Sequence, residues 1–207
     1  MFITLEGPEG AGKSTLARWL RERLVGLGYS ATLTYEPGGT ALGDRLRQLV
    51  LHAADLALDA RAETLLFCAS RAQLVKDVIR PGLRRGDIVI CDRFADSTLA
   101  YQCYGRGLPL EPVRAAIDFA TGGIQPDLTV LLDLDVAEGL RRKRGRGGEP
   151  WDRFELAGLA FNERVRMGYL ELAKAEPRRW LVLDASRPIA EVQDRLWERL
   201  SRELPAK

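Results

Sequence analysis

A glycine-rich loop close to the amino terminus constrains this chain more than any other segment. Residues 7–14 read Gly-Pro-Glu-Gly-Ala-Gly-Lys-Ser, which fits the pattern G-x-x-x-x-G-K-S. The short apolar run Phe2–Leu5 precedes the loop, and leucines at helical spacing follow it. A strand, a glycine loop and a helix in this order allow backbone N–H groups to surround an anion at a helix N-terminus. The pattern predicts a nucleoside triphosphate site, against the alternative of an ordinary glycine-rich turn.

Within this loop, Lys13 is expected to reach the terminal phosphates, and the Ser14 hydroxyl is placed to bind Mg²⁺. Backbone and side-chain atoms of the whole segment are expected to contact the triphosphate. The expected contact residues are Gly7, Pro8, Glu9, Gly10, Ala11, Gly12, Lys13, Ser14 and Thr15.

Composition excludes several classes of protein. The chain has 207 residues, which fits one domain over residues 1–207, and 46% of them are hydrophobic, which excludes intrinsic disorder. Lys and Arg number 31 against 29 Asp and Glu, and a nucleic-acid-binding protein would usually show a larger basic excess. The single histidine, His52, argues against a hydrolase triad or a histidine-ligated metal. The chemistry is therefore expected to use arginines, carboxylates and a metal ion.

The cysteines and the hydropathy pattern indicate a cytoplasmic protein. Cys68, Cys91 and Cys103 are scattered and form no C-x-x-C pair, as expected for reduced thiols. No apolar run approaches the roughly 20 residues of a membrane span. The N-terminus enters a strand at once, so we expect no signal peptide and no membrane partner.

Hydrophobic patterns alternate between strands and helices along the whole chain. Strands are predicted at Phe2–Leu5, Ala31–Tyr35, Ile88–Cys91, Asp127–Asp133 and Arg179–Leu183. Helices are predicted at Leu42–Leu51, Asp59–Leu83, Asp96–Tyr104, Glu111–Thr121 and Val136–Arg144, then from residue 156 to about Ala175 and over Ile189–Leu204. This alternation predicts an α/β fold of three layers, in which helices cover both faces of a five-stranded parallel sheet.

Three further segments carry polar side chains where a ligand could sit. Glu36–Gly39 forms a proline-glycine turn after the second strand, which is either part of a site or a plain connection. Phe67 and Arg71 lie one helical turn apart, so they either stack and hydrogen-bond a base or simply join the core. Asp92 and Arg93 end the third strand, where they can assist Mg²⁺ and clamp a phosphate, or else cap the next helix.

A basic segment interrupts the pattern after the fourth strand. Residues 141–150 combine arginines and a lysine with three glycines and a proline, which cannot pack as a core element. We interpret residues 141–153 as a mobile lid that presents arginines. A nucleic-acid-binding patch and a merely solvated loop are the alternatives.

These segments together resemble the thymidylate kinase family. The resemblance runs from Phe2 to about Glu203. It rests on Gly7–Ser14, Glu36-Pro37-Gly38-Gly39, Phe67 with Arg71, Asp92–Gln102 (D-R-F-x-x-S-T-x-A-Y-Q) and Asp152-Arg153-Phe154-Glu155. The first motif is shared by many nucleotide-binding proteins, but the combination is specific. The resemblance implies transfer of the ATP γ-phosphate to dTMP, with Mg²⁺ as cofactor, in a homodimer formed through the helices around 59–83 and 111–121.

The resemblance also implies a role for individual residues. Phe67 would stack on thymine, Arg71 would hydrogen-bond its edge, and Tyr101 would stand where a ribose 2′-hydroxyl would lie. Arg93 would hold the acceptor phosphate. The residues implied to bind dTMP are Glu9, Glu36, Pro37, Phe67, Arg71, Arg93, Ser97, Tyr101 and Gln102.

The chain is similar to the bacterial-type form of the family. That form has glycine inside the phosphate loop, here Gly10, and supplies catalytic arginines from the lid. Arg153 is the first candidate and Arg146 the second, acting with Lys13 and Arg93. The chain departs from the common family pattern at Tyr35, where many relatives have arginine, and at Cys103, where glycine is common.

Other functions remain open at this point. A kinase for another nucleotide or for a free deoxynucleoside would share the same phosphate loop. A nucleotide-dependent switch would need a guanine-reading N-K-x-D segment, which the sequence lacks. A nucleic-acid-binding module built on the basic segment is the non-enzyme alternative.

Overall fold

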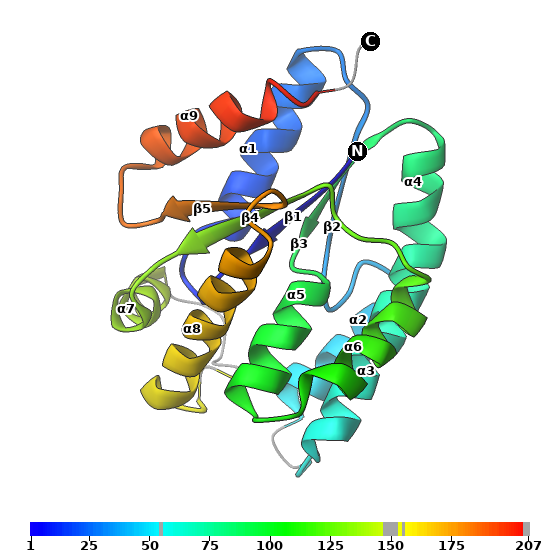
Figure 1. Cartoon of the computed structure of the whole chain (residues 1–207), viewed down its shortest axis with the longest axis vertical. Helices are drawn as coiled ribbons and strands as arrows, with labels where there is room; N and C mark the ends of the chain where they lie inside the picture. Colours follow the sequence, from blue (N-terminus) through cyan, green and yellow to red (C-terminus); the bar gives the residue numbers. More distant parts are fainter. Residues whose placement is uncertain (54–55, 147–152, 155, 205–207) are drawn as a thin grey trace.

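A parallel sheet organises the computed structural model, which describes residues 1–53, 56–146, 153–154 and 156–204. Within these residues, the strand order is β2-β3-β1-β4-β5, and every neighbouring pair is parallel (Figure 1). The strands are β1 (Phe2–Glu6), β2 (Ala31–Tyr35), β3 (Ile88–Asp92), β4 (Leu128–Asp133) and β5 (Trp180–Asp184). The predicted five-stranded parallel sheet is confirmed.

Helices connect successive strands. They are α1 (Lys13–Gly26), α2 (Ala41–Arg47), α3 (Ala60–Leu74), α4 (Arg80–Arg84), α5 (Ala95–Thr98), α6 (Leu110–Thr121), α7 (Val136–Arg146), α8 (Leu159–Ala175) and α9 (Ile189–Leu200). Three π-helical segments, η1 (Gln48–His52), η2 (Val75–Ile79) and η3 (Leu99–Gly105), continue α2, α3 and α5. The long helix expected over 59–83 is therefore α3, η2 and α4 in succession, whereas the last helix ends at Leu200 rather than Leu204.

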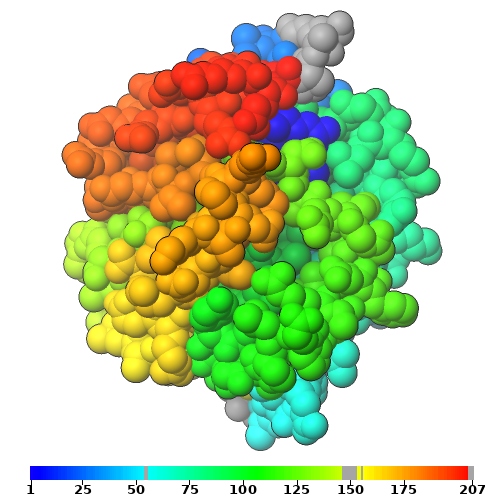
Figure 2. Space-filling model, in the orientation of Figure 1, coloured from blue at the N-terminus to red at the C-terminus, as the bar shows by residue number. Residues whose placement is uncertain are grey.

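Helices cover both faces of the sheet, which explains why the three inner strands β1, β3 and β4 are buried along almost their whole length. Ile3 and Leu5 of β1 pack into one cluster with buried residues of α1 and α9. Phe2, the residue before Ile3, faces the opposite side of the sheet and packs with Leu74 and Ile79. Figure 1 shows α1 and α9 together on one side of the strands. On the other side, α8 and the segment around α5 and α6 hide most of the sheet (Figure 2).

The carboxyl ends of the central strands bring the predicted site segments to one edge. Asp92 at the end of β3 is in register with Leu5 of β1 and with Tyr35 of β2. The strand order shows that the connection from β1 to β2 runs toward one edge of the sheet, whereas the connection from β3 to β4 runs toward the other edge. This reversal opens the crevice in which ligands of open α/β sheets bind.

The structure bears on the cysteines and on the expected lack of a membrane span. Cys68, Cys91 and Cys103 are all buried and free. In the described part of the chain, no helix has both the length and the apolar character needed to cross a membrane.

Candidate active site

The phosphate loop joins β1 to α1 and is built around glycines. Gly7, Gly10 and Gly12 have φ values of 137°, 73° and 95°, in the region that favours glycine. A Cβ atom on Gly10 would lie 2.1 Å from the carbonyl oxygen of Gly139. Among the residues that the structure describes, no side chain caps the first turn of α1. Its N–H groups are therefore open to an anion.

Lys13, the first residue of α1, points back across the loop. Its Nζ donates hydrogen bonds to the carbonyl oxygens of Gly7 (3.1 Å) and Pro8 (2.8 Å). Burial, and then the nearby Arg93 guanidinium, lower the pKa of Lys13 to about 8. The loop thus holds a buried amine close to where the terminal phosphates of a nucleotide would lie.

Ser14 and Asp92 supply oxygen atoms at the mouth of the loop. The Ser14 hydroxyl donates to Asp92 Oδ2 at 2.5 Å, although 78 residues separate them. Among the residues described, no group of three or more His, Cys, Asp or Glu side chains could enclose a metal. Mg²⁺ in nucleotide sites commonly takes one or two protein oxygens and completes its shell with water and phosphates. This hydroxyl–carboxylate pair fits such an ion.

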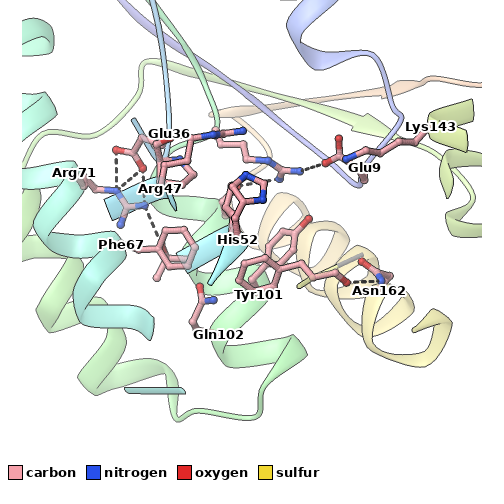
Figure 3. A pocket seen from close by; sticks show the side chains of 16 residues that line it. Glu9, Glu36, Arg47, His52, Phe67, Arg71, Tyr101, Gln102, Lys143 and Asn162 are labelled. Carbon is pink, nitrogen blue, oxygen red and sulfur yellow. Dashed lines mark hydrogen bonds and ion pairs between the residues drawn. The ribbon is translucent and has the colours of Figure 1, made fainter. Parts of the chain in front are cut away.

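Besides the cleft in front of Lys13 and Ser14, a second cavity of about 130 Å³ opens beside the loop; we call it the base-side cavity. All nine residues that the family resemblance assigns to dTMP line it: Glu9, Glu36, Pro37, Phe67, Arg71, Arg93, Ser97, Tyr101 and Gln102. They come from the loop, the turn after β2, helix α3, the end of β3, helix α5 and η3. Figure 3 shows Phe67, Tyr101 and Gln102 around one space, with the Glu36–Arg71 pair on one side and Glu9 on the other.

The Arg71–Glu36 ion pair is buried at the wall of this cavity. Arg71 Nη2 lies 2.7 Å from Glu36 Oε2, and the two residues are 1% and 5% exposed. Burial raises the pKa of Glu36, although the Arg71 charge opposes the shift. Arg71 Nη2 also donates to Phe94 O (3.1 Å) and Thr98 Oγ1 (2.9 Å), but its buried Nη1 has no partner in the described chain. A buried donor of this kind is costly unless an acceptor reaches it.

Arg93 stands between the two cavities. Its backbone is left-handed, with φ 69°, which is uncommon for a residue with a side chain. Its Nη1 donates to Gly7 O (3.1 Å) and Tyr169 Oη (3.1 Å), and its Nη2 donates to Glu9 Oε2 (3.1 Å). Arg93 lines both the base-side cavity and the cleft in front of Lys13 and Ser14. Its guanidinium is thus held where two phosphate groups could meet.

Glu9 carries the opposite charge at this junction. Burial alone would raise the pKa of its carboxyl group, but the charges of Lys13 and Arg93 outweigh burial and lower that pKa to about 2. Glu9 therefore stays ionised and fixes the Arg93 guanidinium through their ion pair.

A buried carboxylic acid binds two side chains, Ser97 and Tyr169, that also contact Arg93. Glu6, the last residue of β1, accepts hydrogen bonds from Phe94 N (2.8 Å), Ser97 Oγ (2.5 Å) and Tyr169 Oη (3.1 Å). Burial, and then the charge of Asp96, raise the pKa of Glu6 to about 7. The sequence analysis missed Glu6 and Tyr169. Nothing in their local pattern shows that residues 6, 97 and 169 meet.

The lid residues divide between the two sides of the site. Arg153 lies 3.7 Å from Glu63 and its backbone N–H donates to Leu51 O (3.3 Å), on the base side. Arg144 of α7 lines the cleft in front of the loop, and Lys143 lines both this cleft and the base-side cavity. The Arg146 side chain and residues 147–152 and 155, including Asp152 and Glu155, lie outside the described residues. The roles of Arg153 and Arg146 in transfer therefore stay predictions.

Several further residues line the base-side cavity without having been predicted. They are Arg47, Leu51, His52, Thr98, Lys143, Phe154 and Asn162. Phe154 belongs to the quoted D-R-F-E motif, so that motif was a usable signal. Arg47, His52 and Asn162 lie on helices whose sequence pattern alone does not tell which face meets the cavity.

Comparison with known proteins decides the family. The family model for thymidylate kinase matches residues 5–196. A thymidylate kinase of Deinococcus radiodurans is 55% identical over 201 residues, covering 97% of this chain and 96% of the relative. The chain belongs to the thymidylate kinase family. The resemblance seen in the sequence motifs is confirmed.

Other members support the same assignment. A thymidylate kinase of Desulfovibrio desulfuricans is 52% identical over 197 residues, covering 93% of this chain and 91% of the relative. The crystal structure of thymidylate kinase from Ehrlichia chaffeensis superposes with a TM-score of 0.78 at 34% identity, covering 97% of this chain and 98% of that one. The thymidylate kinases are nucleoside monophosphate kinases, so the chain is a phosphotransferase, as predicted.

Proposed function

We propose that the chain transfers the γ-phosphoryl group of ATP to dTMP, giving dTDP and ADP for dTTP synthesis. The observation that carries this proposal is the junction of the two cavities. Glu9, Glu36, Arg47, Arg93 and Lys143 line both of them. A triphosphate seated on residues 7–15 and a nucleotide seated beside Phe67 would bring their phosphates together at Arg93.

The chemistry needs alignment and positive charge more than a base. The acceptor phosphate has a second pKa near ~6, so it is already a nucleophile at neutral pH. The loop N–H groups, Lys13 and Arg93 neutralise charge on the moving phosphoryl group. Mg²⁺ held by Ser14 and Asp92 would add charge neutralisation at the phosphate oxygens. Arg153, or else Arg146, would complete the set as the lid closes and excludes water.

The base-side cavity would select the acceptor. Phe67 would stack on thymine, and the unpartnered Nη1 of Arg71 would donate to a carbonyl oxygen at the base edge. Tyr101 lies against Arg93, whose guanidinium carbon is 5.3 Å from the ring centroid. The Tyr101 ring would therefore stand next to the sugar and exclude a 2′-hydroxyl. Ser97, Gln102, Glu9 and Pro37 would complete the dTMP site.

We further propose a cytoplasmic homodimer that uses neither nucleic acid nor a membrane as partner. Its support is the apolar surface of α3 and α6, where Leu65 is 61% exposed and Phe119 is 91% exposed. Sedimentation equilibrium tests this proposal, with twice the chain mass of 23.0 kDa expected and the single mass contradicting it.

Transfer of labelled phosphate separates this function from a nucleotide-dependent switch. With γ-labelled ATP, Mg²⁺ and dTMP, the label is expected in dTDP, and omission of dTMP should suppress ADP formation. Label released as inorganic phosphate at the same rate with or without dTMP would show a hydrolase and overturn the proposal.

A further inference from the structure

A buried carboxylate behind the base-side cavity has no role in the site described above. Glu63 lies on α3 one helical turn before Phe67, is 1% exposed and does not line the cavity itself. Its Oε1 accepts a hydrogen bond of 2.9 Å from Nε2 of Gln102, which does line the cavity. Glu63 therefore touches a side chain that would face the base.

Arg106 hydrogen-bonds Glu63, and Arg153 lies within ion-pair distance of it without a hydrogen bond. Arg106 donates to both carboxylate oxygens at 3.2 Å, and Arg153 Nη1 lies 3.7 Å from Oε2. Both guanidinium groups can only donate, so they require an acceptor at position 63. These contacts fix the Glu63 side chain, and its Oε1 accepts the hydrogen bond from Gln102.

The contact fixes which end of the Gln102 amide faces the ligand. An amide has a donating NH₂ end and an accepting carbonyl end, whereas a carboxylate accepts only. Glu63 therefore takes the NH₂ group, and the carbonyl oxygen is the end left for the cavity. Arg71 lines the same cavity, and its Nη1 is a buried donor without a partner among the described residues. The wall thus offers one donor and one acceptor.

We propose that Glu63 is a specificity-determining positioning residue, which orients the Gln102 amide so that the cavity prefers a thymine or uracil edge to a cytosine edge. Thymine and uracil offer a carbonyl oxygen at position 4 and an N–H at position 3. Cytosine offers an amino group and an unprotonated nitrogen at the same positions, so both contacts become mismatched. This inference rests on the proposed function, because it presumes that a pyrimidine monophosphate binds beside Phe67.

Replacing one oxygen tests the proposal. In Glu63→Gln, the new carbonyl oxygen should take the Oε2 position, where groups of both Arg106 and Arg153 lie, so the new NH₂ group should take the Oε1 position, face Gln102 and reverse its amide. The kcat/KM ratio of dTMP to dCMP should fall about tenfold, the worth of roughly one hydrogen bond. The ratio of dTMP to dUMP should not change, since those bases share the same edge. A ratio to dCMP that stays at the wild-type value would overturn the proposal.

A swapped pair and a matched control sharpen this test. In Glu63→Gln/Gln102→Glu, the carboxylate at 102 can again only accept, so discrimination against dCMP should return even if both rates fall.

Asp77→Asn removes the carboxylate of an exposed Gln73–Asp77 contact on η2, which continues α3, and should change neither ratio. If the swapped pair stays unselective, or if both ratios move together in Glu63→Gln, Glu63 only supports packing. Failure of the proposed function is distinct, because wild-type protein would then not phosphorylate dTMP at all.

Discussion

Lys13 is the single side chain on which the proposed transfer depends most. Its amine lies on the carbonyl groups of Gly7 and Pro8, inside the loop that would hold the phosphates. Lys13→Ala should lower kcat at least about 10²-fold, because a preorganised charge at the moving phosphoryl group is lost. The fold should remain, as checked by circular dichroism. Lys174→Ala, an exposed lysine change on α8, is the control, and near-normal turnover in Lys13→Ala would refute the assignment.

Arg71 should act on one substrate only. Arg71→Ala should raise KM for dTMP about tenfold or more, since a buried donor to the base is removed, and leave KM for ATP unchanged. The substitution also strands the buried Glu36 carboxylate, which costs roughly 3–5 kcal/mol of stability. Arg71→Ala/Glu36→Gln removes that charge and should show the same KM pattern in a more stable protein. Equal rises in both KM values would place Arg71 outside the base site.

The sequence points to single residues most directly where the pattern is local. Lys13 and Ser14 stand in one continuous motif, whereas helical spacing only places Phe67 and Arg71 on one face, and their base-binding role is implied by the family resemblance. Glu6 and Glu63 could not be predicted, because their partners Tyr169 and Gln102 are distant in sequence and only the folded sheet brings them together. Whether Phe67 and Arg71 bind a base stays a prediction.

At the level of the elements, helix α7 raises the question of which arginine, Arg144 or Arg153, acts on the transferred phosphate. Arg144 of α7 lines the cleft in front of the loop, whereas Arg153 lies at Glu63. Arg144→Ala should lower kcat about tenfold or more with little change in KM for dTMP, because charge near the transferred group is lost. Arg141, 74% exposed and paired with Glu138, is the control on the same helix. Normal kcat in Arg144→Ala with a large loss in Arg153→Ala would show that the lid moves Arg153 to the phosphates, as the sequence motif predicts.

The positions of the helices and strands were predictable because the apolar runs of strands and the helical spacing of leucines are both clear in this chain. Apolar runs such as Ile88–Cys91 mark strands covered on both faces, and the glycine loop marks the start of α1. The π-helical geometry of η3 was not predictable from helical spacing, although it carries Tyr101 and Gln102. Such segments often occur at functional sites, where they shift side chains relative to a regular helix.

For the whole molecule, the titration of Glu6 should make the free energy of unfolding depend on pH. Its pKa is raised from 4.5 to about 7 by burial, so the native state binds a proton more tightly than the unfolded chain. The stability from this proton is complete below pH 4.5 and is lost as the pH rises through about 7. The melting temperature of Glu6→Gln minus that of the wild type should therefore be higher at pH 8 than at pH 5. An equal difference at both pH values would contradict the raised pKa, and exposed Glu22→Gln is the control.

The central claim is that two phosphate sites meeting at Arg93 make this chain a kinase for dTMP. A coupled ADP-release assay with ATP, Mg²⁺ and each of dTMP, dUMP, UMP, CMP, AMP and GMP tests it most directly. The account predicts strong turnover with dTMP, weaker turnover with dUMP and little with the other four. ADP release that is the same for every acceptor, or that occurs without one, would contradict it and remove the base-site roles of Phe67, Arg71 and Tyr101.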